Sequence, residues 1–266
     1  MKIKVCIAGA TGWIGKALSS AVAAEEDLEL VSAISRGAAG QNLGGILQSQ
    51  KINLTISGSV EDALAASPDV LVDYTKPDAV KHHALTAISR GVHVVIGTSG
   101  LADADYDEIH NAAEAQNVGV LAAGNFAITA VLLMRFAEIA AKYVPHWEVI
   151  DYAGAGKKDA PSGTVRELAF RLSQVGPPET VHPVSETLGV KETRGATIGG
   201  TQVHSLRLPG YVIAAETIFG LPDERLTIRH DAGSSPDPYV AGTLLAVRKV
   251  QTFSGLRRGL DKIMDL

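Results

Sequence analysis

Apolar runs of strand length alternate with helical segments over the first half of the chain. Residues 2–8 form a β-branched apolar run, as a buried parallel strand requires, and a helix is predicted to follow from Trp13 to about Glu25. Further apolar runs occur at residues 28–34, 69–73, 92–96 and 118–122. This order predicts an α/β fold with a Rossmann-type, doubly wound parallel sheet, and a dinucleotide-binding domain over residues 1–126.

The pattern changes after Phe126, where the regular alternation stops. Residues 176–196 are rich in Pro, Thr and Glu and are predicted to be irregular. Helices are predicted at residues 129–143 and up to 172, and strands at 147–152, 202–208, 211–219 and 225–230. These elements predict a mixed or antiparallel sheet in a smaller α+β domain over residues 127–235. A final helix at 238–250 is expected to return the chain to the first domain, which residues 236–266 complete.

Charge and composition exclude several classes of protein. The 24 Lys and Arg residues are outnumbered by 29 Asp and Glu residues, and a net charge of −5 gives no reason to expect nucleic-acid binding. No apolar run reaches membrane-spanning length, and the chain starts with a strand rather than a signal peptide. The single cysteine, Cys6, excludes an internal disulfide and fits a reducing compartment. We therefore expect a cytoplasmic protein without membrane contact.

Three glycines follow the first predicted strand. Gly9, Gly12 and Gly15 have the G-x-x-G-x-x-G spacing, which permits a tight turn, close approach of a pyrophosphate and close helix–strand packing. The spacing alone is weak evidence, because loops use glycine for many reasons. Its position between a strand and a helix favours a dinucleotide site over an ordinary β–α turn.

The residues after the second predicted strand indicate which cofactor is bound. Arg36 lies 21 positions after Gly15, where an acidic residue would bind a ribose 2′-hydroxyl and an arginine can pair with a 2′-phosphate. Ser35, beside it, places no carboxylate against such a phosphate. The sequence therefore predicts a preference for NADPH, with NADH as the alternative cofactor.

Three later strands also end in short loops with small or polar residues. These loops are Tyr74-Thr75, Gly97-Thr98-Ser99-Gly100 and Ala123-Gly124-Asn125-Phe126. Ligands of an open parallel sheet bind outside the carboxyl ends of the strands. We therefore expect these loops where the nicotinamide half of the cofactor would rest.

Residues 157–164, Lys-Lys-Asp-Ala-Pro-Ser-Gly-Thr, form a candidate anion cradle. Pro161 can open a helix at its first turn, and Ser162-Gly163-Thr164 would then present backbone N–H groups and two hydroxyls at a positive helix terminus. Lys157 adds a charge and a transferable proton. We interpret Lys158 as a solvated neighbour and Asp159 as a residue that orders the loop. A small substrate that carries carboxylates would suit this site.

These motifs together resemble the 4-hydroxy-tetrahydrodipicolinate reductase (dihydrodipicolinate reductase) family of the lysine and diaminopimelate pathway. The motifs, in the family's order over essentially the whole chain, are the glycine turn, Asp73-Tyr74-Thr75, residues 97–100, Asn125-Phe126, K-x-D-A-P-S-G-T and Glu224-Arg225-Leu226. The K-x-D-A-P-S-G-T block is specific, whereas the glycine motif is not. The resemblance implies a Rossmann domain, hydride transfer from NAD(P)H to a cyclic carboxylated imine, and a substrate domain whose sheet builds a homotetramer. The apolar strands over residues 202–219 are expected to form that intersubunit sheet, because such edges would otherwise invite aggregation.

The resemblance also implies roles for single residues. The dinucleotide would contact Gly9, Ala10, Thr11, Gly12, Trp13, Ile14 and Arg36. Gly97, Thr98, Ser99, Ala123, Gly124, Asn125 and Phe126 would lie beside the nicotinamide. Lys157 would be the catalytic proton donor, and Ser162, Gly163 and Thr164 would bind a substrate carboxylate.

One segment departs from the family pattern. The family reads E-x-H-H-x-x-K before D-A-P-S-G-T, with the first histidine in proton transfer and the second in substrate binding. Ala153 and Gly154 occupy those positions here, and neither side chain can carry a proton. Ala127 also follows Asn125-Phe126 where the family favours serine. Either Lys157 protonates the substrate alone, or the pocket is shaped for another substrate.

The eight histidines of the chain offer little replacement for the missing pair. His82 and His83 are predicted on the solvated face of a helix, and His204 and His230 fall in predicted strands, where structural roles are the expectation. No Cys/His cluster has metal-ligand spacing, so we expect no metal.

Three functions remain open from the sequence. The first is the lysine-pathway reductase without its histidine relay. The second is a paralogous NAD(P)H-dependent imine reductase or amino-acid dehydrogenase with a different carboxylated substrate. The third is a non-catalytic NADP(H)-binding sensor, against which the cradle argues, because a sensor has no need of one.

Overall fold

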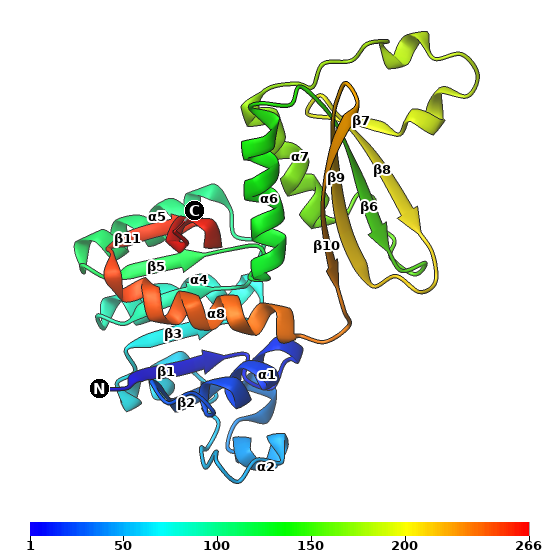
Figure 1. Ribbon diagram of the computed structural model, residues 1–266. Helices are drawn as coiled ribbons and strands as arrows, with labels where there is room; N and C mark the ends of the chain where they lie inside the picture. Colours follow the sequence, from blue (N-terminus) through cyan, green and yellow to red (C-terminus); the bar gives the residue numbers. More distant parts are fainter. Residues whose placement is uncertain (266) are drawn as a thin grey trace. The chain divides into compact units, whose positions relative to one another are not determined.

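The structure is a computed structural model that describes residues 1–265, and the chain divides into two compact units (Figure 1). Unit 1 comprises Met1–Ile128 and Pro236–Asp265, and unit 2 comprises Thr129–Ser235. No helix within residues 1–265 is both long enough and apolar enough to cross a membrane.

Unit 1 is built on a six-stranded sheet in which every pair of neighbouring strands is parallel (Figure 1). The strands are β1 (Ile3–Ala8), β2 (Leu28–Ile34), β3 (Val70–Asp73), β4 (His93–Ile96), β5 (Gly119–Ala122) and β11 (Gly255–Arg258). Their order in the sheet is β11-β5-β4-β3-β1-β2. The chain direction across the sheet therefore reverses between β1 and β3, and such a switch point is where doubly wound folds bind ligands.

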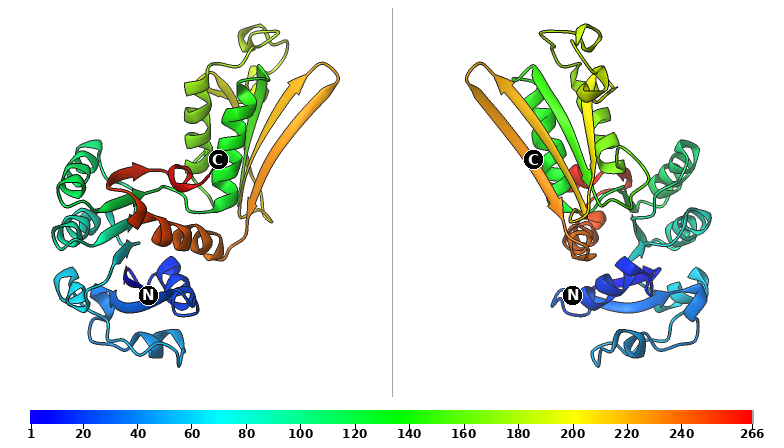
Figure 2. Two further views of the ribbon diagram at one scale, coloured as in Figure 1. Left: turned by 60° about the vertical axis from the view of Figure 1, so that its left-hand side comes forward. Right: turned by 90° about the vertical axis from the view of Figure 1, so that its right-hand side faces the viewer.

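The helices of unit 1 cover both faces of this sheet. They are α1 (Trp13–Val22), α2 (Leu43–Leu47), α3 (Val60–Ala63), α4 (Pro77–Ser89), α5 (Asp103–Ala115) and α8 (Asp237–Lys249), with 3₁₀ turns η1 (Arg36–Ala38), η2 (Leu64–Ala66), η5 (Val250–Thr252) and η6 (Leu260–Ile263). Helix α1 packs against α8 on one face, and α4 packs against α5 on the other (Figure 2). Cys6 lies fully buried in the apolar core, and desolvation raises the pKa of its thiol to about 12, which makes it inert.

Unit 2 contains a mixed five-stranded sheet in the order β10-β9-β6-β8-β7. The strands are β6 (His146–Ala153), β7 (Ala196–Ile198), β8 (Thr201–Arg207), β9 (Ile213–Leu221) and β10 (Glu224–Ala232), and only the β6–β8 pair is parallel. Helices α6 (Ile128–Ala141) and α7 (Gly163–Val175) lie on one face of this sheet (Figure 2). Their apolar sides pack against Trp147, Val149 and Phe219. The long excursion after α7 has two 3₁₀ turns, η3 (Val184–Glu186) and η4 (Lys191–Arg194).

The other face of the unit 2 sheet carries alternate residues of the same strands. Ile150 and Tyr152 of β6 lie there, and the register places Glu216 and Ile218 of β9 beside them. Glu216 accepts a hydrogen bond from the Tyr152 hydroxyl at 2.9 Å and forms an ion pair with Arg229 at 3.2 Å. The sequence predicts apolar strands here, but this face combines apolar side chains with paired charges.

The predicted fold class is confirmed, because unit 1 has the parallel Rossmann-type sheet and unit 2 has the mixed sheet. One prediction about the cradle is wrong. Helix α7 begins at Gly163, and Ser162 is its N-cap, with its Oγ accepting from Val165 N at 3.4 Å. Pro161 therefore precedes the cap instead of occupying the first helical turn, because the Ser162 side chain satisfies an N–H group that a cap must satisfy.

Candidate cofactor and substrate sites

The turn between β1 and α1 has the properties of a phosphate-binding loop. Gly12 is the N-cap of α1 and offers no side chain to the first helical turn, so no cap competes with a ligand for these N–H groups. Gly9 has a φ of +84°, and a Cβ there would lie 2.5 Å from the Tyr74 carbonyl oxygen. A Cβ on Gly15 would lie 2.0 Å from the carbonyl oxygen of Gly9. Both positions therefore require glycine for the turn to close.

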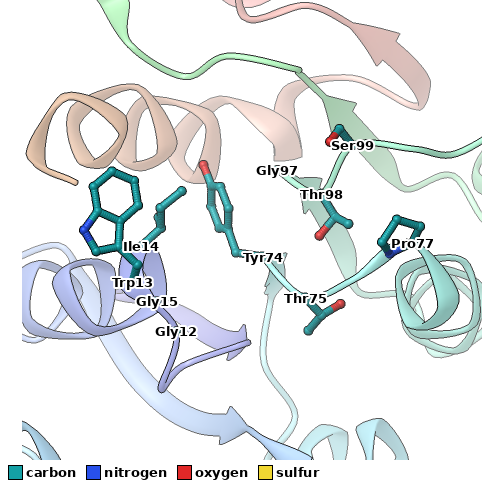
Figure 3. A pocket seen from close by; sticks show the side chains of 10 residues that line it. All are labelled: Gly12, Trp13, Ile14, Gly15, Tyr74, Thr75, Pro77, Gly97, Thr98 and Ser99. Atoms are coloured by element: carbon teal, nitrogen blue, oxygen red, sulfur yellow. The ribbon is translucent and has the colours of Figure 1, made fainter. Parts of the chain in front are cut away.

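A cavity of about 370 Å³ opens at this turn (Figure 3). Its lining residues are Gly12, Trp13, Ile14, Gly15, Tyr74, Thr75, Pro77, Gly97, Thr98 and Ser99. They come from the loops after β1, β3 and β4 and from the starts of α1 and α4, and these three strands are neighbours at the switch point of the sheet. The position and size are those of a small-molecule or cofactor site.

The cavity includes part of the predicted cofactor set. Gly12, Trp13, Ile14, Gly97, Thr98 and Ser99 line it, whereas Gly9, Ala10, Thr11, Arg36 and residues 123–126 are outside its lining. The side chains of Ala10 and Phe126 are buried in the core, so these two residues could contact a ligand only through their backbone. Tyr74 and Thr75 also line the cavity, and they belong to a loop that the sequence predicts beside the nicotinamide half, whereas Gly15 and Pro77 are not among the predicted contacts.

A buried carboxylate, Asp73, fixes two of the lining loops. Its Oδ1 accepts hydrogen bonds from the backbone N of Thr75 at 2.8 Å, from Thr75 Oγ1 at 2.6 Å and from Thr98 Oγ1 at 3.0 Å. Its Oδ2 lies 2.7 Å from Nδ1 of His83. Because Asp73 ends β3 and is fully buried, it ties the loops after β3 and β4 to the sheet.

His83 therefore differs from its prediction as a solvated residue. Its side chain is only 12% exposed and faces Asp73, whereas the side chain of His82 is 65% exposed and pairs with Glu61. Adjacent helix positions point about 100° apart, so a His-His pair at the edge of the buried face divides between core and solvent.

Tyr74 forms the centre of the cavity wall. Its hydroxyl lies 2.7 Å from Thr243 Oγ1, and its ring lies so close to Gly97 that a Cβ there would be 2.2 Å from a ring carbon. Burial raises the pKa of Tyr74 well above its usual value, so its phenol stays protonated. We interpret Tyr74 as a residue that shapes the cavity, with Gly97 leaving room for its ring.

Arg36 lies at the end of β2, as the spacing predicts, but it has an acidic neighbour. One of its guanidinium nitrogens is 3.7 Å from Oδ2 of Asp78, in the first turn of α4, and both side chains are 65% exposed. A cation this open can accept a phosphate, although Asp78 competes for it.

In unit 2, a buried ion pair anchors the cradle. Asp151, at 0% side-chain exposure, accepts from Arg207 Nη2 at 2.6 Å and from the backbone N of Ser162 at 2.9 Å, both through Oδ2. The same Nη2 of Arg207 donates to the carbonyl oxygen of Asp159 at 2.7 Å. Residues of β6 and β8 thus hold both ends of the turn that leads into α7.

Lys157 is held by the acidic residue of the cradle. Its Nζ lies 2.8 Å from Asp159 Oδ1, and this hydrogen bond is the main reason why the pKa of Asp159 is lowered. This ion pair holds the lysine ammonium group at a fixed place within the cradle. The lysine side chain remains 31% exposed.

The two positions that carry histidine in the family pattern are closely packed here. Ala153 is fully buried at the end of β6. A Cβ on Gly154 would already lie 3.0 Å from the Tyr211 carbonyl oxygen, which is tighter than an ordinary contact. A side chain at position 154 would require the Tyr211 backbone to shift by a few tenths of an ångström.

The two histidines predicted in strands of unit 2 are hydrogen-bonded within the protein. His204 Nε2 lies 2.7 Å from Glu148, and His230 Nδ1 lies 2.9 Å from Thr129 Oγ1. Across residues 1–265, no three His, Cys, Asp or Glu side chains come together as a metal site would require.

Comparison with known proteins relates both units to one family. A family model described as "Dihydrodipicolinate reductase, N-terminus" matches residues 3–126, and one described as "Dihydrodipicolinate reductase, C-terminus" matches residues 129–264. A protein of Desulfitobacterium hafniense named 4-hydroxy-tetrahydrodipicolinate reductase is 39% identical over 266 residues, which cover 99% of each chain. A protein of the same name from Moorella thermoacetica is 38% identical over 265 residues, covering 99% of this chain and 98% of the relative.

Solved structures give the same result. The dipicolinate-bound dihydrodipicolinate reductase from Paenisporosarcina sp. TG-14 superposes with a TM-score of 0.88 at 31% identity, covering 99% of this chain and 100% of that one. An amine dehydrogenase from Mycobacterium smegmatis superposes with a TM-score of 0.69 at 12% identity, covering 100% and 97% of the two chains, and this likeness concerns the fold alone.

Proposed function

Because the chain belongs to the dihydrodipicolinate reductase family of NAD(P)H-dependent oxidoreductases, we propose that it reduces the cyclic, carboxylated imine-type substrate of that family with NADPH as its preferred reductant. The observation that carries this proposal is that one chain combines an uncapped glycine turn at a sheet switch point with a lysine-bearing anion cradle. A nucleotide-binding sensor would need the first site and not the second.

The residues of unit 1 suit a dinucleotide. The uncapped N-terminus of α1 offers backbone N–H groups to a pyrophosphate, and the cavity extends from there to the loops after β3 and β4. The reduced nicotinamide supplies the hydride when the cofactor is bound. Gly97, Thr98 and Ser99 would hold that end of the cofactor, and Asp73 would keep Thr75 and Thr98 in their places.

The residues of unit 2 would supply the proton and hold the substrate. Hydride addition to a C=N or C=C bond leaves negative charge that a proton must neutralise. Lys157 is the candidate donor, because its ammonium group has a proton to give and the ion pair with Asp159 holds it within the cradle. Backbone N–H groups of Gly163 and Thr164, at the start of α7, would bind a substrate carboxylate together with Ser162.

Replacement of the lysine tests its role. General acid catalysis contributes roughly 10²–10⁴-fold to a rate, so Lys157→Met should reduce turnover by at least about a hundredfold. NADPH affinity, measured by fluorescence titration, should stay unchanged, because the proposed cofactor contacts belong to unit 1. Lys158→Met, the adjacent charge-matched control, should retain activity.

Full turnover in Lys157→Met, with substrate that the wild type reduces, would remove the lysine from the mechanism. Equal losses in the Lys157 and Lys158 variants would instead indicate a general effect of positive charge near the substrate.

We also propose that the protein assembles as a homotetramer through the sheet of unit 2. In support of this, neither α6 nor α7 covers one face of the sheet, and that face carries Ile150 and Ile218 among its paired charges. Such a mixed surface is typical of subunit interfaces.

A further inference from the structure

Arg166 lies beside the backbone of the cradle. It belongs to the first turn of α7, and its Nη1 donates to the carbonyl oxygen of Pro161 at 2.6 Å. Its Nη2 is 3.8 Å from the position that a Cβ would occupy on Gly163. The guanidinium therefore folds back over the start of the helix, and the side chain remains 55% exposed.

The charge of Arg166 is unfavourable for the helix alone. The N-terminus of a helix carries a partial positive charge, so a cation in the first turn is repelled and an acidic residue is preferred. The first turn of α7 contains no acidic residue. An anion bound at this end of the helix would relieve the repulsion.

A carboxylate already lies between the two cations of the cradle. Asp159 Oδ1 is 2.8 Å from Lys157 Nζ, and Asp159 Oδ2 is 4.0 Å from Arg166 Nη2. One negative charge thus faces two positive side chains and a positive helix end. The net charge of these three side chains is positive, so the cradle would attract a further carboxylate. Both cationic side chains are exposed enough to reach one.

We infer that Arg166 is a substrate-binding residue that contacts a carboxylate of the substrate beside the backbone N–H groups of Gly163 and Thr164. The inference rests on the proposed function, since the substrate class comes from the family. Dipicolinate, the ligand named for the solved relative, is a dianion with a carboxylate on each side of the ring nitrogen. A planar guanidinium is well matched to such a group, because it donates two parallel hydrogen bonds.

The test measures dipicolinate affinity of the full chain by calorimetry, with NADPH present. Arg166→Gln keeps a donor for the Pro161 carbonyl but removes the charge, and it should weaken dipicolinate about tenfold or more, as loss of a charge-assisted contact does. Arg166→Lys should recover part of the affinity. The neutral analogue pyridine-2,6-dicarboxamide should bind the wild type and the Arg166→Gln variant equally, because it offers no charge to the arginine.

A matched control distinguishes a direct contact of Arg166 with the ligand from a general effect of positive charge on the protein. Lys142→Gln also removes one positive charge, from an exposed position of unit 2 just after α6, outside both the cradle and the uncovered sheet face. This variant should bind dipicolinate like the wild type.

In turnover assays Arg166→Gln should raise KM with little change in kcat, because the contact is made before and during the reaction alike.

Unchanged dipicolinate affinity in Arg166→Gln, with a wild type that binds and turns over substrate, would overturn the inference and leave the proposed function standing. Equal weakening by Lys142→Gln would overturn it as well. A wild type that binds NADPH but neither binds dipicolinate nor reduces the family substrate would remove the proposed function, and the role of Arg166 with it.

Discussion

Arg36 is the basis of the prediction that the protein binds NADPH more tightly than NADH. Loss of a charge-assisted contact costs about 1.5–3 kcal/mol, roughly tenfold to a hundredfold in affinity. Because the side chain is 65% exposed and Asp78 lies 3.7 Å away, solvent and Asp78 both reduce this value, and we expect the lower end. Arg36→Ala should therefore weaken NADPH about tenfold and leave NADH nearly unchanged. Fluorescence titration of both cofactors measures the ratio, and equal wild-type affinities would contradict the prediction.

Asp78 offers a complementary variant for the same measurement. Asp78→Asn removes the carboxylate that competes for Arg36. The affinity of this variant for NADPH should therefore rise relative to its affinity for NADH. If Asp78→Asn shifts both cofactors equally, the acidic residue acts on the site through something other than the 2′-phosphate.

The sequence predicts site residues that belong to short motifs. It does not predict contacts between residues that are far apart in the sequence. Gly12, Trp13 and residues 97–99 follow strands directly, so strand prediction places them at the cavity. The Asp151–Arg207 pair joins positions on two strands that only the sheet register brings together. His83 and Asp73 are joined in the same way, since one ends a strand and the other lies within the next helix. No local pattern marks such pairs.

Elements with a strong apolar pattern were predicted with nearly their observed bounds. Strand β2 has the predicted bounds, and α8 is displaced by one residue. Helix α5 and strand β11 were not predicted. Helix α5 buries only Ile109 and Ala113 fully, and β11 is a short edge strand that ends in two exposed arginines, so neither shows the apolar pattern of a core element.

The proposed homotetramer would assemble through the sheet of unit 2. Light scattering at micromolar concentration should give the mass of a tetramer for the wild type. Ile218→Arg, on the sheet face that neither α6 nor α7 covers, should lower the observed mass, because it buries an unpaired charge in the interface. Gln174→Arg, at an exposed position of α7, adds the same charge elsewhere and should leave the mass unchanged. A monomeric wild type would contradict the assembly proposal.

At the scale of the whole molecule, the fold and the family follow from the order of motifs, and the chemistry depends on single residues. Both units match the family from residue 3 to residue 264 with a short gap at 127–128, so the scaffold is that of the reductases. Ala153 and Gly154 have no side chain that could transfer a proton. In our account Lys157 therefore donates the proton, and its ion pair with Asp159 holds it in place.

The most direct test of this account is NADPH oxidation by the purified wild type, with the family substrate generated in situ by the synthase that precedes the reductase. We predict rapid NADPH oxidation that depends on the synthase, and little or no oxidation with a panel of other cyclic imines and 2-oxo acids. Oxidation supported by a member of that panel and not by the synthase product would contradict the account, because the pocket would then serve a different substrate.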